Sequence, residues 1–167
     1  MTPGSPSPRT HIITWDDPMI GANAARTLPG LDYLLALMRG DYPAPPISVL
    51  MGMRLIEVEN GRAVFAVTPA EYLYNPIGTV HGGFACTLLD SALGCAVHST
   101  LAAGTGYMTI ELHTHFIRPI TKETGEMRAI GEIIHSGRRL ATAQARLIDA
   151  EGKLYAHGTT SCMIFTP

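Results

Sequence analysis

Between residues 75 and 90 the chain carries the residue types that acyl-transfer chemistry requires. A polar loop beginning at Asn75 leads into His81-Gly82-Gly83, and a strongly apolar segment follows directly. If that segment is a helix, its first N–H groups lack carbonyl partners, and the glycines allow a ligand to approach the backbone. The pattern therefore predicts an oxyanion hole, a set of donors that stabilises negative charge on a reacting carbonyl oxygen.

Asp90 is the second candidate for chemistry. It is the one formally charged side chain in the apolar segment from Gly82 to Ser99. A carboxylate on an apolar helix is unfavourable unless it is exposed, paired or used. Taken alone, Asp90 would be interpreted as solvent-exposed. Next to the glycine loop it is better interpreted as a functional carboxylate that activates a water molecule.

The spacing of the two candidates constrains how they act together. Gly83 and Asp90 are seven residues apart, so on a helix they share a face but lie about 10 Å apart along the axis. At that separation the base does not serve an oxyanion hole on its own helix. A second copy of the helix, antiparallel across a two-fold axis, would bring its Asp90 close. The spacing thus predicts a site shared between two subunits.

The segments before this window indicate a helix, a connector and a hairpin. Leu28 to Arg39 has the apolar stripe of a short amphipathic helix, and the prolines in Tyr42 to Pro46 indicate a connector. Asn60-Gly61 separates two apolar-rich runs, 53–59 and 62–68, which is the strongest short-range sign of a hairpin.

From Gly82 to about Ser99 almost no polar face remains, and a helix that is apolar all round is a buried one. Beyond Gly106 the apolar period changes to two, which predicts strands at 108–117, 126–135, 139–148 and 153–165. An α+β fold, with one long antiparallel sheet wrapped around the central helix, buries that helix economically. Since one sheet covers only part of it, the remainder is expected to meet another subunit.

Length and composition indicate one folded domain. Of the 167 residues, 46% are hydrophobic; 1–25 are interpreted as a flexible leader and 26–167 as a single domain with an N-terminal helical extension. The net charge of −2 gives no electrostatic basis for nucleic-acid binding. No apolar run is long enough for a membrane span and no signal-peptide pattern is found, so a cytoplasmic protein is expected.

Neither a metal site nor a cysteine nucleophile is expected. Cys86, Cys95 and Cys162 form no CxxC pair and have apolar neighbours, which indicates reduced, packed thiols. His113 and His115 point to the same side of a strand, but no third ligand at suitable spacing completes a metal set.

The run Asn75-Pro76-Ile77-Gly78-Thr79-Val80-His81-Gly82-Gly83, with Asp90 in the following helix, resembles the PaaI-type (phenylacetate-pathway) branch of the hotdog-fold acyl-CoA thioesterases. That branch is related to the 4-hydroxybenzoyl-CoA thioesterases. The match covers roughly residues 50 to 165. It implies a hotdog fold, hydrolysis of acyl-CoA to free acid and coenzyme A, no cofactor, and a homodimer, often paired into a homotetramer.

The resemblance also implies catalytic roles. Asp90 becomes the general base or nucleophile, and the Gly82 N–H together with Asn75 polarises the thioester carbonyl. Thr109, where some members have Ser, holds the water or the carboxylate.

Coenzyme A contacts are implied at the Phe116–Pro119 turn and the His135–Leu140 loop, where the arginines suit phosphates as charge-assisted donors. His81 is expected to orient its loop rather than act as a base. The implied substrate-binding residues are His81, Gly83, Arg118, Ser136, Gly137, Arg138 and Arg139.

Two alternatives remain open. One is a non-catalytic acyl-CoA-binding protein on the same fold. The other is a hotdog hydratase or dehydratase, although those enzymes use a His and an acidic residue at a different spacing. For a thioesterase, aromatic and medium-chain acyl groups, nucleophilic and general-base mechanisms, and dimer and tetramer all remain open.

Overall fold

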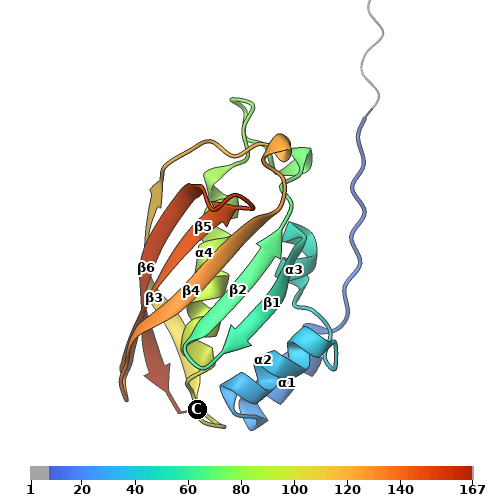
Figure 1. Cartoon of the computed structure of the whole chain (residues 1–167). Coiled ribbons are helices and arrows are strands. Elements are labelled where there is room, and N and C mark those ends of the chain that lie inside the picture. The colour runs from blue at the N-terminus through green and yellow to red at the C-terminus, as the bar shows by residue number, and fades with distance from the viewer. Residues whose placement is uncertain (1–7, 167) are drawn as a thin grey trace, which may run out of the picture.

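A six-stranded antiparallel sheet curves around one long helix, α4 (Gly82–His98). The computed structural model describes residues 8–166. The spatial order of the strands is β1-β2-β4-β5-β6-β3 (Figure 1). Their bounds are β1 Met53–Glu59, β2 Arg62–Val67, β3 Gly106–Phe116, β4 Met127–Ser136, β5 Leu140–Asp149 and β6 Leu154–Phe165. The predicted α+β arrangement, one long sheet wrapped around a central helix, is confirmed.

Small residues on the sheet allow α4 to pack closely. On β5 every second residue is buried toward the core, and these are Ala141, Ala143, Ala145 and Leu147. On β4 a Cβ at Gly131 would collide with the Ala92 carbonyl of the helix. In return α4 buries Leu88, Leu89 and Leu93 completely, and each such side chain contributes about 1.5–3 kcal/mol to folding.

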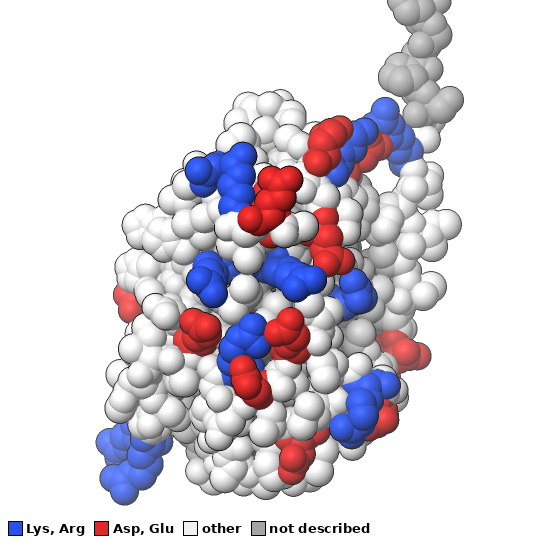
Figure 2. All heavy atoms as spheres, viewed as in Figure 1, with Lys and Arg blue, Asp and Glu red and all other residues white. Residues whose placement is uncertain are grey.

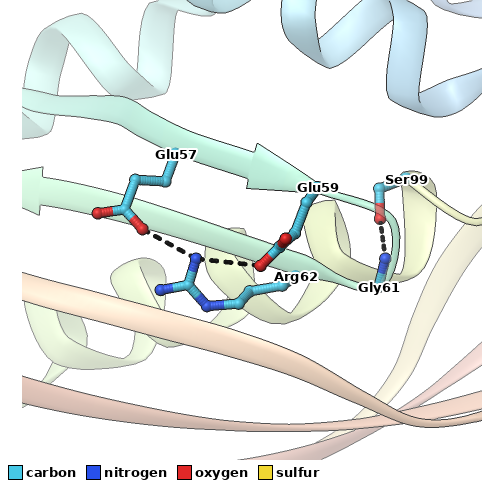
Figure 3. Close-up of polar contacts among 5 residues, drawn as sticks. All are labelled: Glu57, Glu59, Gly61, Arg62 and Ser99. Carbon is cyan, nitrogen blue, oxygen red and sulfur yellow. Dashed lines mark hydrogen bonds and ion pairs between the residues drawn. The ribbon is translucent and has the colours of Figure 1, made fainter.

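The predicted hairpin is present, and its turn is fastened to the end of α4. Asn60-Gly61 joins β1 to β2, with Gly61 at φ 82°, a left-handed conformation that favours glycine. The Gly61 N–H donates to Oγ of the buried Ser99 at 2.8 Å (Figure 3). That hydroxyl in turn donates to the Ala96 carbonyl at 2.7 Å. On the other side of the hairpin Arg62 pairs with Glu57 at 2.8 Å.

Three N-terminal helices form a second layer, α1 (Pro18–Thr27), α2 (Gly30–Arg39) and α3 (Pro46–Met51). Helix α2 docks on the C-terminal end of α4, where the Gly30 N–H donates to the Leu101 carbonyl at 2.9 Å. A Cβ at Gly30 would collide with the His98 carbonyl. The expectation that all of α4 outside the sheet meets another subunit is therefore wrong in part, because the chain's own α2 covers some of it.

The N-terminal segment differs from the sequence interpretation. Helix α1 begins within the predicted leader, after Asp17, and ends two residues beyond it at Thr27. The Asp17 Oδ1 accepts the Met19 N–H at 2.9 Å. It was missed because apolar side chains such as Met19 are exposed and give no buried stripe. Before it, the His11 ring stacks on Tyr72 at 3.9 Å between centroids. The first seven residues of the predicted leader lie outside the described residues.

Two helix boundaries also differ. Helix α2 begins at Gly30 rather than Leu28, because Pro29 takes the extended N-cap conformation. Pro46, placed in the predicted connector, is the first residue of α3, a position where proline loses no hydrogen bond. Two short 3-10 helices lie in connections, η1 (Glu71–Leu73) and η2 (Lys122–Thr124). Among the helices of residues 8–166, none has both the length and the hydropathy required for a membrane span.

The link between the hairpin turn and α4 predicts a measurable loss of stability. Ser99→Ala leaves the buried Gly61 N–H without its acceptor, so the free energy of unfolding should fall by about 1–3 kcal/mol. Urea denaturation measures this change. The matched control is Thr68→Ala, which removes an exposed hydroxyl just beyond β2 and should stay within about 0.5 kcal/mol of wild type. An equal, small effect of both substitutions would show that the turn does not depend on Ser99.

Candidate active site

The N-terminus of α4 is capped by a histidine. His81 is the N-cap residue, and its Nδ1 accepts the Gly83 N–H at 2.9 Å. Its carbonyl accepts the Phe84 N–H at 2.9 Å. Gly82, the first helical residue, precedes the first i to i−4 bond, so its N–H has no carbonyl partner within the helix. His81 therefore fixes the loop, and the Gly82 N–H is the donor that a ligand could use.

A cleft of about 300 Å³ opens at this helix end. Thr79, His81 and Gly82 line one side of it, and the turn from Phe116 to Ile120, with Arg118, lines the other. A Cβ at position 82 would lie 3.3 Å from the Phe116 ring, a tight contact that a small movement of that ring would relieve. Arg118 is tied to the sheet by donating to the Leu154 carbonyl. The structure thus places the glycine loop beside the Phe116–Pro119 turn, for which the family resemblance predicts coenzyme A contacts.

Asn75 shapes the loop that leads into this cleft. Its Oδ1 accepts the N–H groups of Ile77 and Thr79, both at 3.1 Å, and its Nδ2 donates to Thr79 Oγ1 at 2.9 Å. Thr79 in turn lines the cleft, whereas Asn75 itself does not. Within one chain, Asn75 therefore acts on the cleft through Thr79.

Asp90 is held by a hydroxyl from the edge strand. Thr109 Oγ1 donates to Asp90 Oδ1 at 3.0 Å, and both residues are half-buried. A β-bulge at Ile110 shifts the register, so that Thr109 pairs with Cys162 and Glu111 with Ser161. Bulges of this kind change the direction in which side chains point. Here the half-buried positions are Tyr107 and Thr109 before the bulge and Leu112 and Thr114 after it, so the bulge shifts the alternation of β3 by one residue.

Asp90 and Thr109 face a cavity of about 350 Å³ between α4 and the N-terminal helices. Apart from Thr109, none of the residues that share this cavity with Asp90 is predicted from the sequence to belong to the site. Those on α4 follow Asp90 at helical spacing, which was the available signal, whereas nothing in the sequence indicated that α2 and α3 would lie opposite. The lining residues besides Asp90 and Thr109 are Ala25, Tyr33, Leu34, Leu37, Pro45, Ile47, Ser48, Met53, Phe65, Ser91, Gly94, Cys95, His98 and Tyr107.

The thiols near Asp90 are not nucleophiles. Burial raises the pKa of Cys95 to about 12, and repulsion from Asp90 acts in the same direction. Burial also raises the pKa of Cys162, which lies 4.0 Å from Thr109 Oγ1. A thiol attacks only as the thiolate, so both are unreactive at neutral pH. All three cysteines are free, as predicted.

The arginine loop lies at the opposite end of α4 from the Gly82 cleft. Ser136 Oγ is 3.1 Å from Thr100 Oγ1, and the Gly137 N–H donates to the Leu140 carbonyl at 2.9 Å. Arg138 and Arg139 are exposed. Because α4 has 17 residues, this loop and the cleft are about 24 Å apart along the helix. A single chain therefore does not place Arg138 or Arg139 beside Gly82.

Charges elsewhere do not form a single field. On the face shown in Figure 2, the Lys and Arg side chains of the described residues are interspersed with Asp and Glu, without a broad surface of one sign. His113 lies 2.6 Å from Glu111, and His115 stacks on His157 at 5.0 Å between centroids. Within residues 8–166, no group of three His, Cys, Asp or Glu residues is arranged to hold a metal ion.

Comparisons with known proteins identify relatives of this chain. The family model described as "Thioesterase superfamily" matches residues 77–156, which include Gly82, Asp90, Thr109 and Arg138. The 1,4-dihydroxy-2-naphthoyl-CoA hydrolase of Listeria monocytogenes is 24% identical over 104 residues, which are 62% of this chain and 83% of that protein.

Solved structures give the same result. The phenylacetic acid degradation-related protein of Ralstonia eutropha JMP134 superposes with a TM-score of 0.71 at 28% identity, covering 78% of this chain and 98% of that one. A structure described as a protein from the thioesterase superfamily matches with a TM-score of 0.65 at 30% identity, covering 80% of this chain and 97% of the other. The resemblance found in the sequence is thereby confirmed.

Proposed function

The chain belongs to the thioesterase superfamily, and we propose that it hydrolyses acyl-coenzyme A thioesters to the free acid and coenzyme A. The observation that carries the proposal is the hydrogen bond from Thr109 to Asp90 at 3.0 Å, at the wall of a largely apolar cavity. It holds a carboxylate in one orientation where an acyl group can be bound. Helix α4, which carries Asp90, begins at the cleft lined by Gly82, whose backbone N–H is available to a ligand.

In the proposed reaction Thr109 holds Oδ1 of Asp90 and leaves Oδ2 for the chemistry. As a general base, Asp90 takes a proton from water while the water oxygen attacks the thioester carbonyl carbon. The Gly82 N–H, at the helix N-terminus, stabilises the oxyanion. Collapse of the intermediate breaks the C–S bond and releases coenzyme A thiolate, which takes up a proton. Direct attack by the carboxylate would instead give a mixed anhydride, which water then hydrolyses.

Two copies of the chain are required for this reaction. Gly82 and Asp90 line different cavities that have no residue in common, and along α4 they are about 12 Å apart. Hydrogen-bond reach to one carbonyl is only about 3 Å. An antiparallel second helix brings the partner's Asp90 to the cleft of Gly82. We therefore propose a homodimer with two shared sites.

The edge of the sheet supports this self-association. Strand β3 is an edge strand, and its Met108 and Ile110 side chains are 50% and 55% exposed. An apolar edge strand favours pairing with another chain. Pairing of β3 with its copy would cover these side chains and bring together the two helices that flank β3. Pairing of such dimers into a homotetramer, as in the family, is part of the same proposal.

In the proposed dimer, the hydrogen bond between Gly83 and His81 fixes the loop that contacts the thioester carbonyl of the substrate. Arg118 lines the cleft through which the thioester enters. Because the Arg138-Arg139 loop is remote from the cleft of its own chain, we propose that it binds coenzyme A phosphates in a site completed by another subunit. Ser136 and Gly137 set the shape of this loop through the bonds described above.

Substitution of Asp90 tests the proposed chemistry. Asp90→Asn preserves size and removes the base, so kcat for acyl-CoA hydrolysis should fall at least about a hundredfold with the fold intact. Thiol release measured over a panel of aromatic and medium-chain acyl-CoA substrates detects the loss. Asp32→Asn, at an exposed carboxylate of α2, is the control and should retain wild-type turnover. Full activity of Asp90→Asn on every substrate that the wild type cleaves would refute the mechanism.

The arginine loop yields a prediction about KM. Replacing Arg138 and Arg139 together by Ala should raise KM for acyl-CoA several-fold and weaken its dependence on ionic strength, because two phosphate contacts are lost. Hydrolysis of a pantetheine thioester, which lacks the nucleotide phosphates, should barely change. Arg146→Ala, an exposed arginine of β5, serves as the control. Equal losses with both substrates would assign the loop a structural role.

A further inference from the structure

Two cavities meet at His98, the last residue of α4. The larger, of about 350 Å³, contains Asp90. The smaller, of about 180 Å³, is lined by α1 and by the segment before β3. Both include Ala25, His98 and Tyr107. These three residues therefore form the partition between the cavities, and the two rings supply most of its bulk.

The partition stands at a fixed distance from the carboxylate. Asp90, Gly94 and His98 follow at intervals of four residues, so they lie on one face of α4, with His98 about 12 Å beyond Asp90. A Cβ at Gly94 would lie 2.8 Å from the Tyr107 hydroxyl. The glycine thus gives the Tyr107 ring room to lie against the helix, 5.5 Å from the His98 ring. The ring of Tyr33, on α2, lies on the His98 ring as well, with 5.6 Å between the two ring centroids.

The larger cavity suits an uncharged, mainly apolar group. Asp90 is the one carboxylate among its lining residues. Burial raises the pKa of Tyr33 and of Tyr107 and lowers the pKa of His98, so these three side chains are neutral at pH 7. Such walls disfavour the phosphates of coenzyme A, because an unpaired charge in an apolar site is costly. They favour the acyl part of a thioester.

We propose that the larger cavity binds the acyl group, and that His98 and Tyr107 set the greatest acyl length the enzyme accepts. This inference rests on the proposed thioesterase function. The thioester carbonyl lies at Asp90 and the far end of the acyl group meets the two rings. An aromatic or medium-chain acyl group fits within two helical turns, whereas a long-chain group requires the second cavity, which the partition closes.

The roof of the proposed acyl cavity lies outside the residues that the family model matches, whereas His98 and Tyr107 lie within them. Tyr33, Leu34 and Leu37 of α2 and Ile47 of α3 roof the cavity, and all four precede the matched residues 77–156. The shape of the acyl cavity therefore depends on this chain's N-terminal helices as well as on His98 and Tyr107, and family membership alone does not determine it.

The test is a chain-length profile of kcat/KM over butanoyl-, hexanoyl-, octanoyl-, dodecanoyl- and hexadecanoyl-CoA. The wild type should be most active on a medium chain and should fall steeply by hexadecanoyl. His98→Ala joins the two cavities, so kcat/KM for hexadecanoyl-CoA relative to octanoyl-CoA should rise at least about tenfold. Tyr107→Leu opens the partition from the other side and serves where His98→Ala fails to fold. Met38→Ala, on α2 but outside this cavity, should leave the profile unchanged.

The possible failures are distinguishable. A wild-type protein that cleaves no acyl-CoA would overturn the proposed function itself. A wild-type profile that does not decline at hexadecanoyl would overturn the inference while leaving the function in place. Folded His98→Ala and Tyr107→Leu variants that keep the wild-type chain-length profile would also overturn the inference and leave the proposed function in place.

Discussion

The need to cover helix α4 on all sides organises this molecule. The sheet covers one side through its alanine-rich inner face, and Gly131 lets the two backbones meet. The N-terminal layer covers part of the other side, where Gly30 lets α2 contact the His98 carbonyl. Asp90 and Thr109 lie between these two layers, where packing is incomplete and a cavity remains. The proposed site therefore occupies the region in which apolar coverage of the helix stops.

Rigid packing of α4 also fixes the distance between its two chemical groups. The Gly82 donor and the Asp90 carboxylate are part of one straight element that is held at its start by His81 and at its end by Ser99. Neither group can approach the other without breaking the helix. The proposed site shared between two copies follows from this helix geometry. The same helix places the proposed acyl cavity at Asp90 and the proposed carbonyl cleft at Gly82.

Much of this arrangement was predictable from the sequence because it depends on local patterns. Asn60-Gly61 marked the hairpin, and the run from Gly82 to Ser99 marked the buried helix. The pairing of Thr109 with Asp90 followed from the family resemblance. The cavity roof was not predictable, because the apolar stripe of α2 shows which face is buried but not what it is buried against. Helix α1 has no such stripe and gave no signal.

The central claim is that Gly82 of one subunit works with Asp90 of the other. Gly82→Pro removes the N–H and preserves the start of the helix, since proline is tolerated at the first helical position and His81 already has the extended conformation that precedes proline. Proline and alanine both add a Cβ that contacts the Phe116 ring. Gly82→Ala keeps the N–H and is its matched control. Co-expressed Gly82→Pro and Asp90→Asn chains, each inactive alone, should regain about a quarter of wild-type activity, because half of randomly paired dimers carry one intact site. Hybrids that demonstrably form yet stay inactive would contradict the shared site.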